Sequence, residues 1–170
     1  MNFKERAIYV FPISILTIAL DQWTKYLAVV NLKGMPEIPY LGGFFRLMFV
    51  TNRGAWGSLG SDWPEPARLA ALIIIPIIFI LLLGAYMFWP KVKIKKFELI
   101  AFSFILAGGV GNMIDRIHAG AVIDMLWMGF AEYRYLQTNV FNIADVAIMI
   151  GFFIVAIEWV VTSVKSVLRK

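Results

Sequence analysis

The segment "LIAFSFILAGGVGNMIDRIHAGAVIDM" (residues 99–125) begins with sixteen uncharged residues, Leu99–Ile114, and then becomes polar. Asp115, Arg116 and Asp124 follow within ten positions. A helix needs roughly 17–25 predominantly apolar residues to cross a bilayer. The segment therefore predicts a membrane-spanning helix with a charged cluster at the end where it leaves the membrane.

The composition of the whole chain also predicts an integral membrane protein. Of its 170 residues, 61% are hydrophobic and 16% are charged, whereas soluble domains are about 45–50% apolar and about 25% charged. The sequence contains no cysteine and a single histidine, His118, which excludes thiolate chemistry and a histidine-rich zinc site.

Four apolar stretches of the sequence fit transmembrane helices, provided that three of them carry a polar residue near one end. They lie at approximately residues 8–29, 69–89, 98–115 and 140–163. These spans predict a single membrane-embedded, all-α domain over residues 1–170.

The first apolar stretch would also fit a cleaved signal peptide, because Lys4 and Arg6 precede it. Such a peptide ends at a cleavage site made of small residues. Asp21 and Lys25 stand at that position instead, so a retained transmembrane helix is the preferred interpretation.

Nine of the sixteen basic residues lie in three short segments that a four-helix topology places on one side. They are Lys4, Arg6, Lys91, Lys93, Lys95, Lys96, Lys165, Arg169 and Lys170. Because short cytoplasmic segments are enriched in Lys and Arg, we expect both termini and the loop at 90–98 in the cytoplasm. The net charge of +5 then reflects topology and contact with membrane lipids, and no nucleic-acid partner is expected.

Two longer loops lie on the opposite side of the membrane, at approximately residues 31–68 and 115–139. The first is interrupted by prolines and glycines and contains "FFRLMFV" (residues 44–50), whose composition favours β-structure. We therefore expect short strands that lie on the extracytoplasmic surface of the membrane.

Most polar residues of the spans fall at this extracytoplasmic end. They are Asp21 and Lys25 on the first helix, Asn112, Asp115 and Arg116 on the third, and Asn142 and Asp145 in the first turns of the fourth. Asp124 falls in the loop between the third and fourth helices. Because charges at membrane depth normally face the bundle interior and pair, one interpretation is two ion pairs, Asp21–Lys25 and Asp115–Arg116.

Two further features of this region have structural interpretations. Gly108, Gly109 and Gly111 lack the context of a nucleotide-binding loop, and they predict close packing of the third helix against a neighbour. His118 is interpreted as a loop or interfacial residue and not as a catalytic base.

The antiparallel arrangement of the last two helices can bring Asp124 close to Asp145. Two neighbouring carboxylates resist double ionisation and hold one proton between them. Such a pair suits hydrolysis, since one carboxylate can take a proton from water while the other donates one to a carbonyl oxygen. The same polar cluster would also fit a small proton- or ion-coupled membrane transporter.

The motifs and their order resemble those of a known family. "GNMIDRIHAGAVID" (residues 111–124) and "FNIADVAI" (residues 141–148) resemble signature blocks of bacterial lipoprotein signal peptidase, or signal peptidase II. "DQWTK" at Asp21–Lys25 and "NRGAWG" at Asn52–Gly57 are similar to two other blocks of that family. The resemblance extends over essentially the whole chain.

This resemblance implies an aspartyl endopeptidase of the bacterial inner membrane that cleaves prolipoproteins just before a diacylglyceryl-modified cysteine. It implies Asp124 and Asp145 as the catalytic dyad near the outer face, and a small extracytoplasmic β-sheet cradle beside the four helices. The residues implied to bind substrate or to support the site are Asn52, Gly54, Asn112, Asp115, Arg116, Asn142, Asp21 and Lys25. Because an aspartyl dyad hydrolyses peptides without a metal ion, the resemblance implies neither a metal ion nor a cofactor. We expect the protein to act as a monomer.

Overall fold

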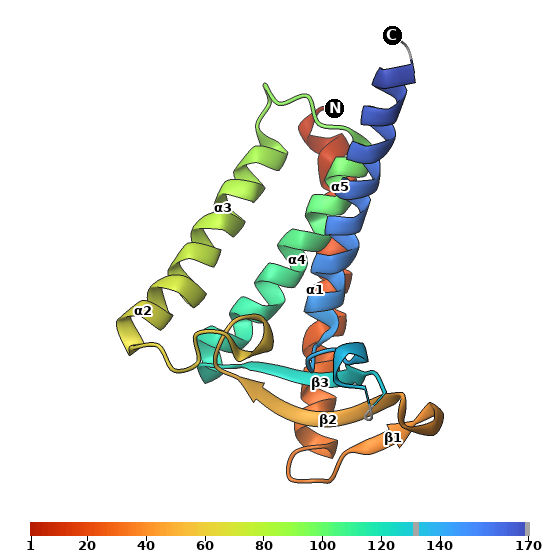
Figure 1. Cartoon of the computed structure of the whole chain (residues 1–170). Helices are drawn as coiled ribbons and strands as arrows, with labels where there is room; N and C mark the ends of the chain where they lie inside the picture. The colour runs from red at the N-terminus through yellow and green to blue at the C-terminus, as the bar shows by residue number, and fades with distance from the viewer. Residues whose placement is uncertain (131–132, 169–170) are drawn as a thin grey trace.

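The computed structural model describes residues 1–130 and 133–168, so Arg169 and Lys170 of the predicted cytoplasmic tail lie outside the described residues. Within this range, four helical stretches are long and apolar enough to cross a membrane, as the sequence predicts. They are α1 (Phe3–Asn31), the run Glu65–Phe88, α4 (Lys96–Ala119) and α5 (Ile143–Leu168). The two termini lie at the same end of the bundle (Figure 1).

The second span consists of three consecutive segments: α2 (Glu65–Leu69), a π-helical turn (Ala70–Ile74) and α3 (Ile75–Phe88). Pro76 has no N–H to donate to the carbonyl four residues earlier, and its ring needs room beside that carbonyl. The wider π-helical turn, which ends at Ile74 and contains the residue four positions before Pro76, supplies this room. The span is therefore deformed near the end that faces the sheet (Figure 1).

A three-stranded antiparallel sheet lies across the opposite end of the helices from the termini (Figure 1). Its strands are, in spatial order, β1 (Ile38–Tyr40), β2 (Phe45–Asn52) and β3 (Val122–Met128). The strands expected in the first long loop are therefore present, and the second long loop adds β3.

The expectation that Asp124 lies in a loop is wrong, because residues 122–128 form a strand that pairs with β2. Asp124 lies opposite Val50, and Asn52 lies two residues further along β2. Since side chains alternate between the faces of a sheet, Asn52 and Asp124 project from the same face. Strand pairing thus brings together two polar residues that are far apart in the sequence.

The centre of the helical bundle is α4, which packs against α1, α3 and α5. A Cβ atom on Gly108 would collide with the backbone carbonyl of Ala144 in α5. A Cβ on Gly111 would lie 2.5 Å from the Asp21 Oδ2 atom, and one on Gly109 would lie 3.3 Å from Ile80. The predicted close packing at these glycines is confirmed.

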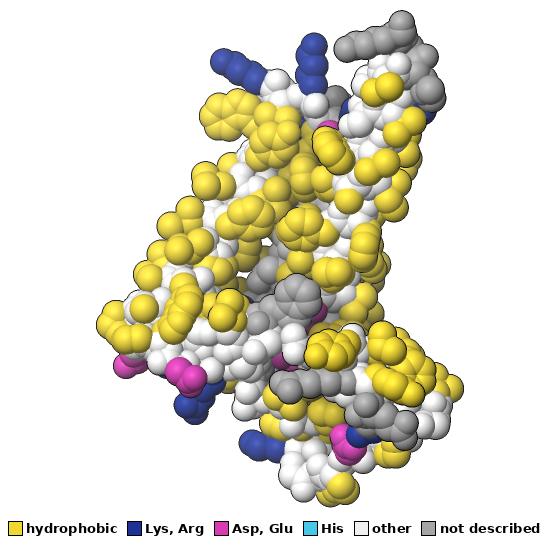
Figure 2. Space-filling model, viewed as in Figure 1, with side chains coloured by type: hydrophobic (Ala, Val, Ile, Leu, Met, Phe, Trp, Pro, Cys, Tyr) yellow, Lys and Arg dark blue, Asp and Glu magenta, His cyan; other side chains and the backbone are white. Residues whose placement is uncertain are grey.

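Hydrophobic side chains cover the long sides of the helices on the face shown in Figure 2, and charged side chains gather at the two ends. Basic side chains protrude at the end that carries the termini, and both acidic and basic side chains appear at the sheet end. This distribution fits a bundle whose sides contact lipid and whose ends contact water, because only the ends can hydrate charges.

Arg6 is buried at the end of the bundle that carries the termini, although the sequence suggests only a cytoplasmic charge. Its Nη1 donates hydrogen bonds to the carbonyl oxygens of Met87 (2.8 Å) and Trp89 (3.0 Å), and its Nη2 donates to that of Val92 (2.6 Å). These carbonyls belong to the end of α3 and the loop that follows it. Arg6 therefore ties α1 to the connection between the second and third spans.

We predict that Arg6→Met destabilises the protein by on the order of 2 kcal/mol, because buried carbonyl groups lose their charged donor. Thermal unfolding of the purified protein in detergent measures the change. Lys4→Met is the matched control, since Lys4 is exposed on the same helix. Equal unfolding temperatures for the two variants would contradict the role assigned to Arg6.

Candidate active site

A buried lysine joins α1 to α4 at the sheet end of the bundle. The Lys25 Nζ atom lies 2.8 Å from Asp21 Oδ2 and 2.9 Å from Asp115 Oδ2, and it donates a hydrogen bond to Asn112 Oδ1 at 3.0 Å. The expected Asp21–Lys25 pair is confirmed. The expected Asp115–Arg116 pair is wrong, since Asp115 pairs with Lys25; consecutive residues on a helix point in different directions.

The two carboxylates of this cluster also hold the backbone of neighbouring elements. Asp21 Oδ1 accepts a hydrogen bond from the Ala144 N–H at the start of α5 (2.9 Å), and Asp115 Oδ2 accepts one from the Ile123 N–H in β3 (3.0 Å). Gln22 donates to both carboxylates, at 3.2 Å and 3.1 Å. The sequence analysis did not identify Gln22 as part of this cluster. Its position next to Asp21 was the one feature of the sequence that could have indicated it.

Asp124 lies in β3 with only 2% of its surface exposed. Its Oδ1 accepts a hydrogen bond from Asn142 Nδ2 (2.7 Å), and its Oδ2 accepts one from Asn52 Nδ2 (3.2 Å). Burial, and secondly the negative charge of Asp145, raise the pKa of Asp124 to about 6, against the opposing effect of the two amide donors. The Asp124 carboxyl group therefore keeps its proton at mildly acidic pH.

Asp145 lies in the first turn of α5 and forms a reciprocal cap with Asn142, which directly precedes that helix. The Asp145 N–H donates to Asn142 Oδ1 (2.9 Å), and the Asn142 N–H donates to Asp145 Oδ2 (3.1 Å). Asn112 Nδ2 donates to Asp145 Oδ1 (2.8 Å). This arrangement has the geometry of a capping box, which fixes the carboxylate at the positive end of the helix dipole.

The fully buried Asn142 connects the two carboxylates. Its Nδ2 contacts Asp124, and it also donates to Asn112 Oδ1 at 3.0 Å. Its backbone N–H and its Oδ1 engage Asp145. Asp124 and Asp145 are therefore linked through one asparagine that is hydrogen-bonded to both, and their charges interact.

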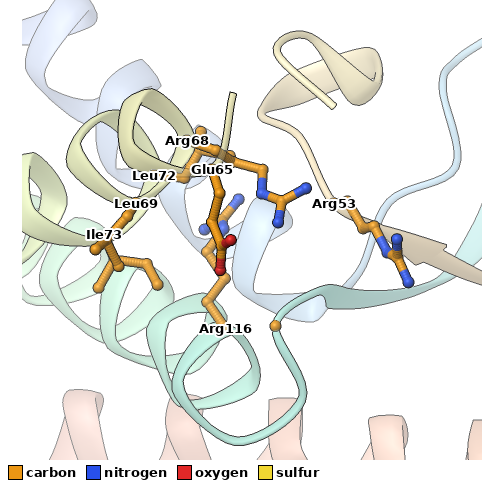
Figure 3. Close-up of a pocket in the computed structure, with 8 residues that line it drawn as sticks. Arg53, Glu65, Arg68, Leu69, Leu72, Ile73 and Arg116 are labelled. Carbon is orange, nitrogen blue, oxygen red and sulfur yellow. The ribbon is translucent and has the colours of Figure 1, made fainter. Parts of the chain in front are cut away.

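Arg116 connects the end of α4 to the loop after β2. Its Nη2 donates to the carbonyl oxygen of Gly54 (3.1 Å), and the Gly54 N–H donates to Asn52 Oδ1 (2.9 Å). A Cβ on Gly54 would lie 2.5 Å from the backbone of Ser58 and Leu59, so the turn requires glycine. Arg116 also lies within electrostatic reach of three carboxylates, and its side chain is visible in Figure 3.

All the residues predicted for the site belong to one connected network of hydrogen bonds and ion pairs. They are Asp21, Lys25, Asn52, Gly54, Asn112, Asp115, Arg116, Asp124, Asn142 and Asp145. His118 lies outside it, is exposed and contacts the Ile114 carbonyl oxygen. Within residues 1–130 and 133–168, no group of three acidic or histidine side chains is placed to hold a metal ion.

The fold places this site in a class of membrane enzymes. One solved structure, described as a bacterial membrane enzyme determined by the in meso method at 1.9 Å resolution, superposes with a TM-score of 0.74 and 25% sequence identity, covering 88% of this chain and 91% of that one. A second, with the same description at 2.3 Å resolution, gives a TM-score of 0.73 at 24% identity and covers 91% and 88% of the two chains.

Sequence comparison identifies the family within this class. The family model described as signal peptidase (SPase) II matches residues 13–161. The chain therefore belongs to the signal peptidase II family, which confirms the resemblance of its motifs and makes it a protease. The comparisons do not support a transporter.

Named relatives agree with this assignment. A lipoprotein signal peptidase of Pelodictyon phaeoclathratiforme is 39% identical over 147 residues, which are 83% of this chain and 83% of that protein. One from Fusobacterium nucleatum is 33% identical, covering 93% of this chain and 89% of the relative. One from Lactobacillus johnsonii is 33% identical and covers 98% and 100%.

We predict that Lys25→Met lowers the stability of the protein by about 3–5 kcal/mol, because two buried carboxylates lose their counter-charge. Adding Asp21→Asn to this variant is expected to restore part of the loss. Thermal unfolding in detergent measures both effects. Lys33→Met is the control for loss of an exposed positive charge near the end of α1, and a loss as large in this control would contradict the assignment.

Proposed function

We propose that this chain is an aspartyl endopeptidase that removes the signal peptide from prolipoproteins, cleaving before a diacylglyceryl-modified cysteine. The observation that carries the proposal is the bonding of Asn142 to both Asp124 and Asp145. A buried pair of carboxylates at the membrane surface provides the general acid and the general base that peptide hydrolysis requires. The names of the relatives supply the substrate class.

The environments of the two carboxylates suggest different roles for them. Asp124 is buried in the sheet and has a pKa of about 6, which makes it the general acid. Asp145 is half-buried and so more accessible to water than Asp124, and it accepts hydrogen bonds from Asn112 and Asn142 at the positive end of the α5 dipole. Asp145 is accordingly the general base.

In the proposed reaction, Asp145 takes a proton from a water molecule whose oxygen attacks the scissile carbonyl carbon. Asp124 gives its proton to the carbonyl oxygen, which forms a neutral tetrahedral diol. Asp145 then transfers its proton to the leaving nitrogen while Asp124 regains one from a hydroxyl group. The C–N bond breaks, and the dyad returns to its starting protonation state.

Arg116 and the asparagines serve as positioning residues in this proposal. Arg116 keeps its charge at any working pH and holds the loop around Gly54 beside the dyad. Asn112 and Asn142 fix the orientation of the carboxylates through bonds of 2.7–3.1 Å. In the buried Asp21–Lys25–Asp115 cluster, Lys25 donates a hydrogen bond to Asn112 and so fixes the position of that side chain.

The location of the dyad fits a substrate that is itself a membrane-spanning signal helix. The site lies at the sheet end of the bundle, opposite the basic end that carries the termini (Figures 1 and 2). With the termini in the cytoplasm, the scissile bond of such a helix reaches the dyad at the outer face of the inner membrane. A single chain contains both carboxylates, so we propose that the enzyme acts as a monomer. The proposed reaction involves no nucleic acid.

We predict that Asp124→Asn and Asp145→Asn each reduce cleavage of a diacylglyceryl-modified prolipoprotein by at least about 1,000-fold, since each removes one proton-transfer group. The assay uses purified protein, and an unfolding curve for each variant verifies folding. Asp62→Asn, in the exposed outer loop, is expected to retain full activity. Substantial activity in either dyad variant would overturn the assignment of Asp124 and Asp145 as the catalytic dyad. The same assay with a prolipoprotein that lacks the diacylglyceryl group tests whether the enzyme requires that group on its substrate.

We also predict the pH dependence of the reaction. In the free enzyme, kcat/KM is expected to fall as the pH rises above about 6, because Asp124 loses the proton that it must donate. Asn52 stabilises the ionised form of Asp124, so Asn52→Ala is expected to raise the pKa of Asp124 and move this falling limb to higher pH. Thr51→Ala is the control. A shift to lower pH in Asn52→Ala would contradict the acid role of Asp124.

A further inference from the structure

A cavity of about 170 Å³ lies at the sheet end of the second span, where α2 and the π-helical turn face the end of α4. Its charged lining consists of Arg53, Glu65, Arg68 and Arg116. Figure 3 shows the side chains of Arg68 and Arg116 in the same region of the cavity, with the carboxylate of Glu65 beside them. The proposed peptidase reaction uses only Arg116 of these four residues.

Two half-buried arginines bring like charges into this one cavity. They are Arg68 and Arg116, whereas Arg53 and Glu65 are exposed to water. Arg116 has carboxylates within electrostatic reach. Within the part of the chain that the structure describes, Arg68 forms no side-chain hydrogen bond or ion pair, and Glu65 pairs with neither arginine. Arg68 therefore carries a positive charge that an anion in the cavity would balance.

A buried donor also points into the chemistry of this cavity. Among the described residues, the Arg116 Nε–H is buried and has no hydrogen-bond partner. A buried donor without an acceptor costs free energy, so an oxygen acceptor beside Arg116 would stabilise this arrangement. A carboxylate has both the oxygen acceptors and the negative charge that the two arginines lack, and the paired donors of a guanidinium group fit its geometry.

Arg116 connects this cavity to the proposed catalytic dyad. It lies four residues after Asn112 on α4, and residues one helical turn apart are about 5–6 Å from each other. Asn112 Nδ2 donates a hydrogen bond to Asp145 Oδ1 at 2.8 Å. The charges of Asp145 and Asp124 both act on Arg116. A group that leaves the dyad therefore meets Arg116 about one helical turn away.

The proposed reaction creates such an anion at the dyad. The oxygen of the attacking water stays on the carbonyl carbon while the C–N bond breaks, so the released signal peptide ends in a new carboxyl group. The pKa of a terminal carboxyl group is about 3.3–3.7, and at neutral pH its proton passes to the freed amine or to water. Asp145 is ionised again at the end of the reaction and repels the new carboxylate, whereas arginines attract it.

We propose that the cavity binds the C-terminal carboxylate of the cleaved signal peptide, with Arg68 and the Arg116 Nε–H as its donors. Leu72 and Ile73, which also line the cavity, contact the last apolar residues of that peptide. The uncleaved substrate has a neutral peptide bond in place of this carboxylate, so the arginines favour the product and draw it away from the dyad. This inference rests on the proposed function and adds a product site to it.

The test compares two forms of a synthetic lipoprotein signal peptide that ends at the residue before the cysteine and has no acidic side chain. One form ends in a free carboxylate and the other in a carboxamide. Binding of each form to the purified full-length protein is measured at pH 7 in an uncharged detergent. The free acid is expected to bind about tenfold more tightly than the amide, because its charge strengthens the hydrogen bonds to arginine.

Three variants test the charges of the cavity. Arg68→Gln is expected to reduce the tenfold preference for the free acid to about twofold, with the Kd of the amide unchanged. Glu65→Gln removes the negative charge of the cavity and is expected to increase the preference, since less repulsion acts on the carboxylate. Lys33→Gln, which removes an exposed positive charge outside the cavity, is expected to leave it unchanged.

The outcomes separate the product site from the proposed function. Equal affinity for the two forms in the unaltered protein would overturn the product site and leave the proposed peptidase reaction standing. A full preference for the acid in Arg68→Gln, a loss of preference in Lys33→Gln or no increase in Glu65→Gln would also overturn the product site. Failure of both forms to bind would overturn the proposed function and the product site together.

Discussion

The ammonium group of Lys25 is the interaction on which the sheet end of the molecule depends. A positive charge at membrane depth must be matched inside the protein, and Lys25 is matched by Asp21 from its own helix and by Asp115 and Asn112 from α4. The same carboxylates accept hydrogen bonds from the first turn of α5 and from β3. One buried charge thereby sets the relative positions of two helices, the start of a third and a strand.

Two asparagines connect this buried cluster to the two carboxylates that we propose as the catalytic dyad. Asn112 contacts Lys25 on one side and Asp145 on the other, and Asn142 bridges Asp145 and Asp124. Amides suit this role, because each offers donors and an acceptor without adding another charge to a buried site. The two carboxylates remain in different settings, one in a strand and one at a helix N-terminus, and such differences allow chemically identical groups to act as acid and base.

The two ends of the bundle use arginine for different purposes. At the end with the termini, the Arg6 guanidinium group donates hydrogen bonds to three backbone carbonyl oxygens and has a structural role. At the sheet end, Arg53 and Arg68 line a cavity, and within the described chain neither forms a side-chain hydrogen bond or an ion pair. The π-helical turn of the second span contributes Leu72 and Ile73 to the lining of the same cavity.

The sequence by itself determined the four spans, their polar ends and the family, because apolar length and the order of short motifs are local properties of the chain. It also identified every residue of the polar network except Gln22. Only the tertiary structure decided which partners meet. It paired Asp115 with Lys25 instead of Arg116, placed Asp124 in a strand, buried Arg6 and gathered Arg53 and Arg68 around one cavity. The physical reason is that these contacts join residues far apart in the chain, and helix packing and strand register set such distances.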